Sequence, residues 1–468
     1  METLEDTRLW QTLAALSARE MNAFRKFLDS PYFNQRTDVI GLLESVMRHM
    51  RSKKRVTHKG LWESVHPGKP YDNQQLRLLM SYLHKLAGQF LAVESLMANE
   101  ADCRRRVVET WGRKGQTAIQ ARSMEEAFRY LERSPVRNAD YYFETYLLHQ
   151  EQYRQASRQR PEKGAGSQLV DRSINIAFAA MKLRQACLLL AHGQVYDWGF
   201  VPSMLEPIDD FVQANNLLDE PCIGIYWHGI RMLRHPDEER YFQAFKALLL
   251  AYGGVFPPGE VQDLYLLAIN YGVRRVNDGQ LSYFHDIMDF YRDGLKHEYL
   301  LQDGQLSRFT YHNIVSVALQ IDQADWAEVF IQEWTSRLDR RFRERMESFN
   351  RAKIAYCRRR YDEAVSLLQR SNYHDPLLNL GARTLLLKIY FELEEFDALQ
   401  SHLDAFQNYL LRKPELGYHR ANYRHLIRYT RKLLALRPND AAARQSMRQH
   451  IESEKILTEK EWLLKCLE

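Results

Sequence analysis

Basic side chains follow one face of a predicted helix near the end of the chain. The stretch GYHRANYRHLIRYTRKLLALRPN, residues 417–439, contains no Asp or Glu. Its arginines recur at steps of four, four and three, with a lysine and a tyrosine beside them; we call these residues the basic stripe: Arg420, Arg424, Arg428, Arg431, Lys432 and Tyr423. Unopposed cations repel one another, so the stripe predicts an acidic partner. The alternative is that acids on neighbouring helices neutralise it.

The common catalytic motifs do not occur in the sequence. HExxH, GxGxxG, GxxxxGK[ST] and GxSxG are all missing. The histidines are scattered, and the six-residue step from His419 to His425 does not place two metal ligands on one helical face. We therefore expect a protein that is not an enzyme and that holds no cofactor and no metal.

The composition predicts a cytoplasmic protein. A net charge of +5, from 65 basic and 60 acidic residues, permits an acidic partner without requiring one. The five cysteines lie far apart without a CxxC pair, which argues against disulfides and zinc knuckles. The first residues, METLEDTRLW, lack the pattern of a signal peptide. Uninterrupted apolar runs are far shorter than the ~18 residues of a membrane span, so we expect no membrane contact.

Helical periodicity dominates the chain. Pro and Gly, which interrupt helices, are scarce at 14 and 21 residues. Asp72 and Gln75 form a predicted capping box before apolar residues at helical spacing: Leu76, Leu79, Met80, Leu83, Leu86 and Phe90. No segment shows the sustained two-residue alternation of a strand. The polar residues 156–168 predict an exposed loop between helices. The fold class predicted is all-α, built of short antiparallel helix pairs.

An aromatic residue followed by an amphipathic run returns at a step of 35 residues. Trp326, Tyr361 and Phe396 each follow an apolar cluster and a polar turn, and apolar residues come three positions later: Val329, Ala364 and Leu399. In this register each aromatic begins the second helix of a pair. We expect Tyr361 to be largely buried and Ala364 to lie at a close helix contact.

The middle unit, residues 348–376, resembles the tetratricopeptide family. Tyr361 to Ala364 match the opening of that family's second helix, Leu368 matches its large position and Pro376 its closing proline. The flanking units match in part, over about residues 305–411. The resemblance implies an irregular α-solenoid whose groove holds a peptide or another protein.

The first hundred residues resemble a second kind of protein. The run LWESVHPGKPYDNQQLRLLMSYLHKLAGQFL is similar to the helix-turn-helix part of bacterial activators that join a winged-helix domain to tetratricopeptide-like helices. Gln74, Gln75 and Arg77 occupy the early helix positions that face base edges in DNA readers. The two strands of a wing are not apparent, and a helical cap over the first repeat is the preferred interpretation.

Together these patterns predict three segments: an N-terminal helical domain at 1–110, an irregular array of helical hairpins at 111–304, and tetratricopeptide-like repeats with a C-terminal capping helix at 305–468. The expected function is a non-catalytic scaffold or adaptor that binds a protein or peptide; an acidic partner is one of the two interpretations of the basic stripe, beside neutralisation by neighbouring helices. The alternative is a nucleic-acid-binding regulator. It would bind DNA through the N-terminal domain, or RNA through the basic helices, since pentatricopeptide arrays share the 35-residue step.

Overall fold

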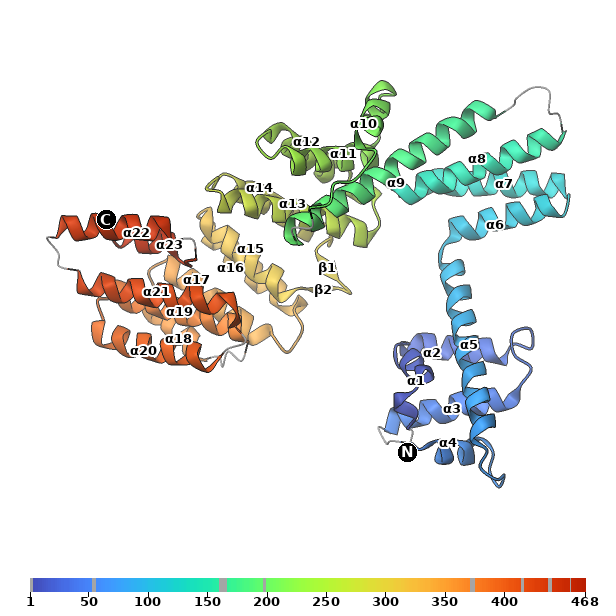
Figure 1. Cartoon of the computed structure of the whole chain (residues 1–468), viewed down its shortest axis with the longest axis horizontal. Helices are drawn as coiled ribbons and strands as arrows, with labels where there is room; N and C mark the ends of the chain where they lie inside the picture. Colours follow the sequence, from blue (N-terminus) through green and yellow to red (C-terminus); the bar gives the residue numbers. More distant parts are fainter. Residues whose placement is uncertain are drawn as a thin grey trace. The chain divides into compact units, whose positions relative to one another are not determined.

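The computed structural model describes residues 3–52, 56–159, 166–196, 199–370, 375–413, 416–436, 440–454 and 456–468. The regular structure of these residues is almost entirely helical, which confirms the all-α prediction (Figure 1). The exception is a short hairpin of β1 (Leu301–Gln302) and β2 (Gln305–Leu306). The chain divides into two compact units, Met1–Leu190 with Gly199–Trp227, and Ala191–Trp198 with His228–Glu468. The boundary predicted near residue 110 falls within the first unit, and the one near 305 within the second.

The beginning of the first unit has a hydrophobic core of its own, drawn from residues 4–90. The elements around it are η1 (Leu4–Asp6), α1 (Arg8–Ala14), α2 (Ala18–Asp29), α3 (Thr37–Ser52), α4 (His58–Val65) and α5 (Asn73–Ala98). Asp72 caps α5 by accepting a hydrogen bond of 3.0 Å from the backbone N–H of Gln75. The six apolar residues predicted to face inward on α5 are all buried.

The next helices continue the chain as hairpins. They are α6 (Glu100–Arg113), α7 (Thr117–Arg133), α8 (Ala139–Gln159), α9 (Ser167–Tyr196), α10 (Leu205–Ala214), η3 (Leu217–Asp219) and α11 (Pro221–Arg234). The loop predicted at 156–168 is shorter than expected, because α8 continues to Gln159 and α9 begins at Ser167; residues 160–165 lie outside the described residues.

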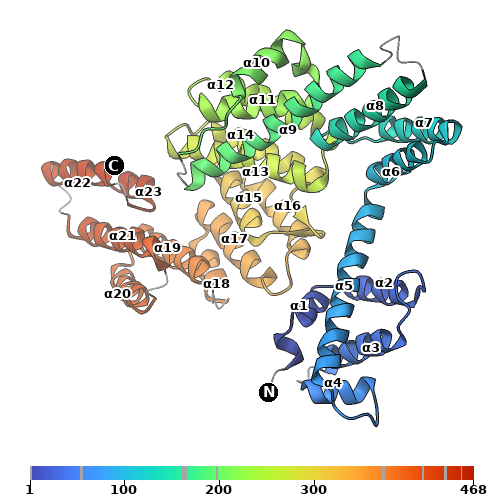
Figure 2. The ribbon, with the colours of Figure 1, turned by 45° about the vertical axis from the view of Figure 1, so that its right-hand side comes forward.

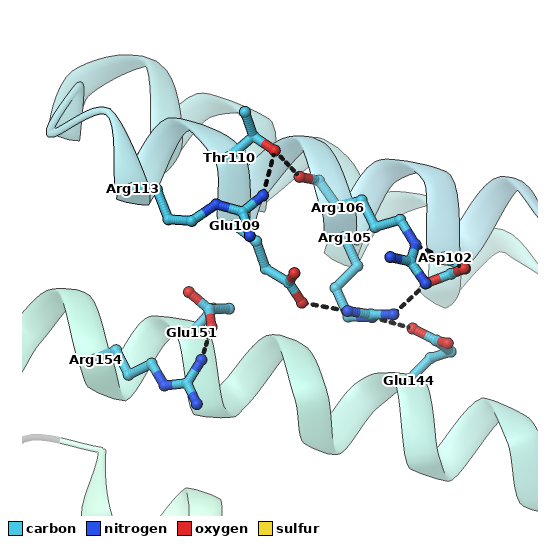
Figure 3. Close-up of polar contacts among 9 residues, drawn as sticks. All are labelled: Asp102, Arg105, Arg106, Glu109, Thr110, Arg113, Glu144, Glu151 and Arg154. Atoms are coloured by element: carbon cyan, nitrogen blue, oxygen red, sulfur yellow. Dashed lines mark hydrogen bonds and ion pairs between the residues drawn. The ribbon is translucent and has the colours of Figure 1, made fainter. Parts of the chain in front are cut away.

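A charged cluster fastens α6 to α8 (Figure 3). The guanidinium of Arg105 is 11% exposed and donates to Glu144 of α8 over 2.8 Å, while its other nitrogens bind Asp102 and Glu109 of its own helix. Burial raises the pKa of Glu144, and the Arg105 charge opposes that rise. Because each of these groups is partly desolvated, removing Arg105 alone would leave uncompensated carboxylates inside the hairpin.

Helix α9 is long and apolar. Among the described residues, Ser167–Gly193 is the one segment with the length and composition of a membrane span, with a mean hydropathy of 1.4 and 33% of its most apolar window buried. This segment escaped the sequence analysis because polar residues interrupt its apolar runs. Arg184 within it forms an ion pair of 3.2 Å with Asp140 of α8. A helix in the core of a water-soluble protein has the same composition.

The second unit continues the helical pairs to the end of the chain. Its elements are α12 (Glu239–Tyr252), η4 (Gly253–Val255), α13 (Pro258–Asn277), α14 (Tyr283–Lys296), β1, β2, α15 (Arg308–Gln320), α16 (Ala324–Trp334), η5 (Thr335–Arg337), α17 (Arg343–Cys357), α18 (Tyr361–Arg370), α19 (Pro376–Glu392), α20 (Phe396–Arg412), α21 (Tyr418–Ala435), α22 (Ala441–Ser453) and α23 (Lys460–Lys465). The pairs α13–α14 and α15–α16 can be followed in Figure 2, where the helices of each pair lie side by side.

Five of the described helix pairs, one in the first unit and four in the second, are joined by turns of the same geometry. A residue with a left-handed backbone ends the first helix of α6–α7, α13–α14, α15–α16, α17–α18 and α19–α20; these residues are Gly115, Gly279, Asp322, Arg359 and Glu394. In each turn the next residue donates its N–H to the carbonyl five residues before it, over 2.8–3.0 Å. This hydrogen bond satisfies a carbonyl that the helix end would otherwise leave unpaired.

These turns correct the register of the predicted repeat. From Asp322 to Arg359 the step is 37 residues, and from Arg359 to Glu394 it is 35. The first of the three predicted repeats, the one containing Trp326, was therefore aligned two residues too late. In the corrected register the position three residues into the second helix is fully buried in all three units, as Ala327, Ala364 and Leu399. Val329, which was predicted to occupy that position, is 50% exposed.

The aromatic position at the start of each second helix is less buried than predicted. Tyr361 is half-buried, and its hydroxyl donates to Glu392 over 2.8 Å. Phe396 is 52% exposed. Trp326 is half-buried and lies outside the equivalent position, which Ala324 occupies. Ala364 and Leu368 of α18 are buried in the core of this region, together with Phe349 of α17.

Candidate ligand groove

A cavity of about 460 Å³ lies among α15, α17 and α19 in the second unit. We call it the groove. Residues of all three helices, together with Tyr423 of α21 and Glu459 before α23, line it. A volume of this size falls within the range of small-molecule sites, roughly 300–1,000 Å³.

The groove is lined by equivalent positions of successive helical pairs. On α15 these are Arg308, Phe309, His312, Ser316, Leu319 and Gln320. At a step of 37 residues the same positions on α17 are Arg345, Met346, Phe349, Lys353, Tyr356 and Cys357. At a further step of 35, α19 contributes Gly381, Thr384 and Lys388. One face of each first helix is therefore turned toward the groove, as stacking of repeated pairs produces.

Apolar side chains form much of the wall. They include Phe309, Leu319, Phe342, Met346, Phe349, Leu378 and Leu385. Gly381 keeps the wall tight, since a Cβ built there would lie 2.8 Å from the ring of Phe349. Arg308 stacks over the Phe342 ring at 4.4 Å and forms an ion pair of 2.9 Å with Asp375. The charge of that arginine is thus compensated within the wall.

A chain of polar groups runs from α17 to α15 and back. The Asn350 amide donates to the carbonyl of Met346 over 2.7 Å, so its oxygen accepts from Nδ1–H of His312 over 2.9 Å. Burial lowers the pKa of His312 to about 3, so the imidazole is neutral. The Ser316 hydroxyl donates to the carbonyl of His312 over 2.9 Å and accepts from Nζ of Lys353 over 2.7 Å.

Serine, histidine and lysine side chains thus meet in the groove, but their geometry is not that of a nucleophile with its base. The hydroxyl proton of Ser316 is directed at a backbone carbonyl, and Nε2 of His312 lies 3.5 Å from the hydroxyl oxygen. Ser316 lies inside α15, where the backbone N–H groups are used in the helix and none is left for an oxyanion. The arrangement favours binding over acyl transfer.

Among the described residues that line the groove, Lys353 lacks the ion pair that Arg308 and Lys388 have. Its ammonium donates to Ser316 over 2.7 Å and, among the described residues, forms no ion pair. Burial lowers the pKa of Lys353 to about 8. Arg345, at the groove edge on the same helix, is half-buried and also lacks an ion pair in the described part of the chain.

Lys388 occupies the equivalent position on α19 and is compensated. Its Nζ lies 2.9 Å from the carboxylate of Glu459 and 5.0 Å from the centre of the Tyr356 ring. Glu392 fixes the C-terminal segment to α19, because its carboxylate accepts from Tyr361 over 2.8 Å, from the Trp462 indole over 3.0 Å and from the Tyr356 hydroxyl. The C-terminal segment therefore gives Lys388 an ion pair, while at Lys353 the same carboxylate acts only as a nearby charge that opposes the fall in its pKa.

Acids on neighbouring helices neutralise part of the basic stripe. Nη2 of Arg428 lies 2.9 Å from the carboxylate of Glu454, which follows α22. Arg431 forms an ion pair with Asp404 of α20. Lys432 is exposed, with Nζ 5.8 Å from the centre of the Tyr429 ring. For Arg428 and Arg431 the stripe is thus internally paired.

The remaining members of the stripe differ in their surroundings. Arg424 is exposed and Arg420 half-buried, and neither forms an ion pair among the residues described. Tyr423 packs toward the core, with its ring 5.9 Å from that of Phe406, and it also lines the groove. Two arginines of the stripe, Arg420 and Arg424, therefore have no ion pair in the described part of the chain.

The residues proposed to contact nucleic acid lie at the start of α5. Gln74, Gln75 and Arg77 are all exposed there. Residues 66–72 separate α4 from α5, a longer connection than the three to four residues of a helix-turn-helix motif. Within 3–52 and 56–98, the strand pairing described is a single bridge between Thr3 and Thr57, so these residues form no wing.

Ser316, Lys353 and Lys388 line the groove but were not among the site residues predicted from the sequence. Each is an ordinary polar residue inside a predicted helix, and none belongs to a motif. What relates them is the repeat. In the corrected register all three occupy the same position on α15, α17 and α19, which are the first helices of successive pairs. The step of 35 throughout would have paired Lys353 with Ala318, a buried core residue.

Comparison with known proteins adds no relative. No protein-family model matches the chain, and neither the curated proteins nor the solved structures that were searched contain a match.

Proposed function

We propose that this chain is a non-catalytic, cytoplasmic scaffold that binds a protein partner through stacked tetratricopeptide-like hairpins. The observation that carries the proposal is the repetition of the groove-lining face at steps of 37 and 35 residues on α15, α17 and α19. Repeated hairpins of this kind form extended binding surfaces, because each pair buries its apolar face against the next and leaves the other face open.

The charge of the second unit favours an acidic partner. Arg424 and Arg420 have no ion pair among the described residues, and Arg345 and Lys353 bring further uncompensated charge to the groove. An acidic segment of another protein would gain from these charges in encounter rate and in orientation. The affinity should therefore fall as salt screens the exposed arginines over ~8–10 Å.

The test is affinity capture from the native cell, with nuclease-treated and untreated lysate in parallel. The tagged chain is compared with the double variant Arg420→Glu and Arg424→Glu, and with Arg19→Glu as a matched charge reversal at an exposed position of α2. We expect the same proteins to be retained after nuclease treatment, to be lost by the double variant and to be kept by the control. Equal capture by all three forms would contradict the role of the stripe.

Nucleic-acid binding is the second candidate, and the exposure of Gln74, Gln75 and Arg77 at the start of α5 favours it. A double variant with Gln74→Ala and Arg77→Ala tests it by filter binding to duplex DNA and to single-stranded RNA at low and moderate salt. We expect no submicromolar binding by the unmodified chain. Such binding, abolished by the double variant, would replace the scaffold proposal with that of a DNA-binding regulator.

A further inference from the structure

We infer that the groove binds a small amphiphilic anion, with a carboxylate or phosphate group on the ammonium of Lys353 and an apolar body against Phe309 and Met346. This inference goes beyond the proposed function: it concerns the same groove, but it is tested on the chain alone, without a protein partner. Three observations carry it: the charge left in the groove, the character of its wall and its volume.

The charge in the groove calls for an anion. Four cations line it, and the two carboxylates present are already engaged, Asp375 by Arg308 and Glu459 by Lys388. Lys353 and Arg345 remain. Buried ammonium groups are ordinarily paired, since transfer of an unpaired charge out of water is unfavourable. A bound anion would be the counter-ion of Lys353, as the Glu459 carboxylate is the counter-ion of Lys388.

The immediate surroundings of Lys353 leave room for that anion. Ser316 accepts one of its three N–H bonds, and the neutral imidazole of His312 lies behind the serine. The other charged or titratable groups around it are Lys388, Glu459 and Cys357, and of these the Glu459 carboxylate is held by Lys388. Two N–H donors of the ammonium are thus available to the oxygens of a ligand.

The wall and the volume define the rest of the ligand. A cavity of about 460 Å³ suits a small molecule, and its wall is rich in aromatic and aliphatic side chains. A simple hydrated anion would leave these side chains in contact with water, while an uncharged apolar molecule would leave Lys353 unpaired. A molecule with one anionic group and an apolar chain satisfies both.

The experiment measures binding of four probes to the full chain by isothermal titration calorimetry at pH 7. Octanoate and octyl phosphate carry both features, 1-octanol has the chain without the charge, and acetate has the charge without the chain. We expect one site per chain for octanoate or octyl phosphate, with affinity at least tenfold above that of octanol and acetate. The tighter of the two anions identifies the head group. Octanol binding as tightly as both anions would overturn the inference.

Two variants test the role of Lys353 in different ways. Lys353→Met removes the charge at similar volume, and Ser316→Asp places a carboxylate of the chain itself beside the ammonium, at the position whose hydroxyl lies 2.7 Å from Nζ. Each should weaken the charged probe at least tenfold and leave octanol unchanged. Arg19→Met, an exposed cation outside the groove, is the matched control and should bind like the unmodified chain.

The pH dependence gives an independent readout. The affinity for octanoate, which is ionised throughout this range, should be constant from pH 6 to pH 7.5 and fall by roughly tenfold per pH unit above pH 8, where Lys353 in the free protein loses its proton. Lys353→Met should show no such fall. Unchanged affinity in both Lys353→Met and Ser316→Asp, each checked for a native circular dichroism spectrum, would refute the site.

Discussion

Replacing Lys353 by methionine should stabilise the protein in the absence of a ligand. The side chain lies in a largely apolar groove and has one hydrogen-bond partner, Ser316, but no ion pair among the described residues. Methionine has a similar length and helix propensity and needs no water or counter-ion. The substitution therefore removes an electrostatic cost while keeping most of the packing in α17.

The magnitude follows from the pKa. Burial lowers the pKa of Lys353 from the ordinary 10.5 to about 8. Because one pKa unit corresponds to about 1.4 kcal/mol, the charged form costs the folded state about 3 kcal/mol at neutral pH. Part of the side chain remains accessible to solvent, and methionine leaves Ser316 without its donor, so the expected gain in unfolding free energy is about 2 kcal/mol.

The sign of the pH dependence is fixed by the direction of the shift. Below pH 8 the lysine is protonated in both the folded and the unfolded chain, and the cost is fully present. Between pH 8 and pH 10.5 the folded state loses its proton first, so the stability of the unmodified chain rises relative to the variant. Above pH 10.5 both states are neutral and this contribution disappears.

Denaturation by urea at a series of pH values from 6 to 11 measures this difference directly, since all other titrating groups are common to the two proteins. We expect the variant to be more stable below pH 8 and the two curves to converge near pH 10.5. A variant less stable than the unmodified chain at pH 7, or a difference that does not change with pH, would refute the view that Lys353 is an uncompensated buried charge. Octanoate should stabilise only the unmodified chain.

Three further substitutions test the packing and the charge pairs, each by thermal and chemical denaturation. Ala327→Leu should lower stability by about 1–3 kcal/mol because the site is fully buried, whereas Val329→Ala should change it by less than about 0.5 kcal/mol. Arg428→Glu should lower the melting temperature by placing like charges beside Glu454, while Arg424→Glu should leave it unchanged. Glu392→Gln should cost about 1–2 kcal/mol, because a neutral amide accepts more weakly from two tyrosines and an indole.

The helical class was predictable because its signals are local. Scarce Gly and Pro, capping residues such as Asp72, and apolar residues at helical spacing all act within one or two turns of the chain. The five shared turns were only partly visible for the same reason. Gly115 and Gly279 are the expected residues for a left-handed backbone, whereas Asp322, Arg359 and Glu394 marked their turns only by being polar.

The error in the repeat register has a physical origin. The predicted register was set by Trp326, because large aromatic residues at a fixed step suggest core positions. In the three repeats, however, these aromatic residues are only half-buried or exposed. The position that does repeat in burial is alanine in two repeats, Ala327 and Ala364, and leucine in the third, Leu399. Alanine is common throughout helices, so its recurrence carries little weight in a single sequence.

The site was less predictable than the fold because its chemistry depends on what faces each charge. In sequence, Lys353 and Lys388 are similar lysines inside helices. Stacking places them at one position of neighbouring first helices, so each feels the other as a like charge. Arg428 and Arg424 differ in the same way, since Glu454 reaches only the first of them.

The stacking of equivalent positions also explains why one charge stays uncompensated. In a series of like helices, a side chain on the groove face meets the same position of the helix before and after it. For Lys353 these neighbours are Ser316 and Lys388, a hydroxyl and a second cation. Lys388 receives a carboxylate from the C-terminal segment, through Glu459. The Glu459 charge also reaches Lys353 and opposes the fall in its pKa, but its carboxylate is paired with Lys388, so an anion from outside is what would give Lys353 an ion pair of its own.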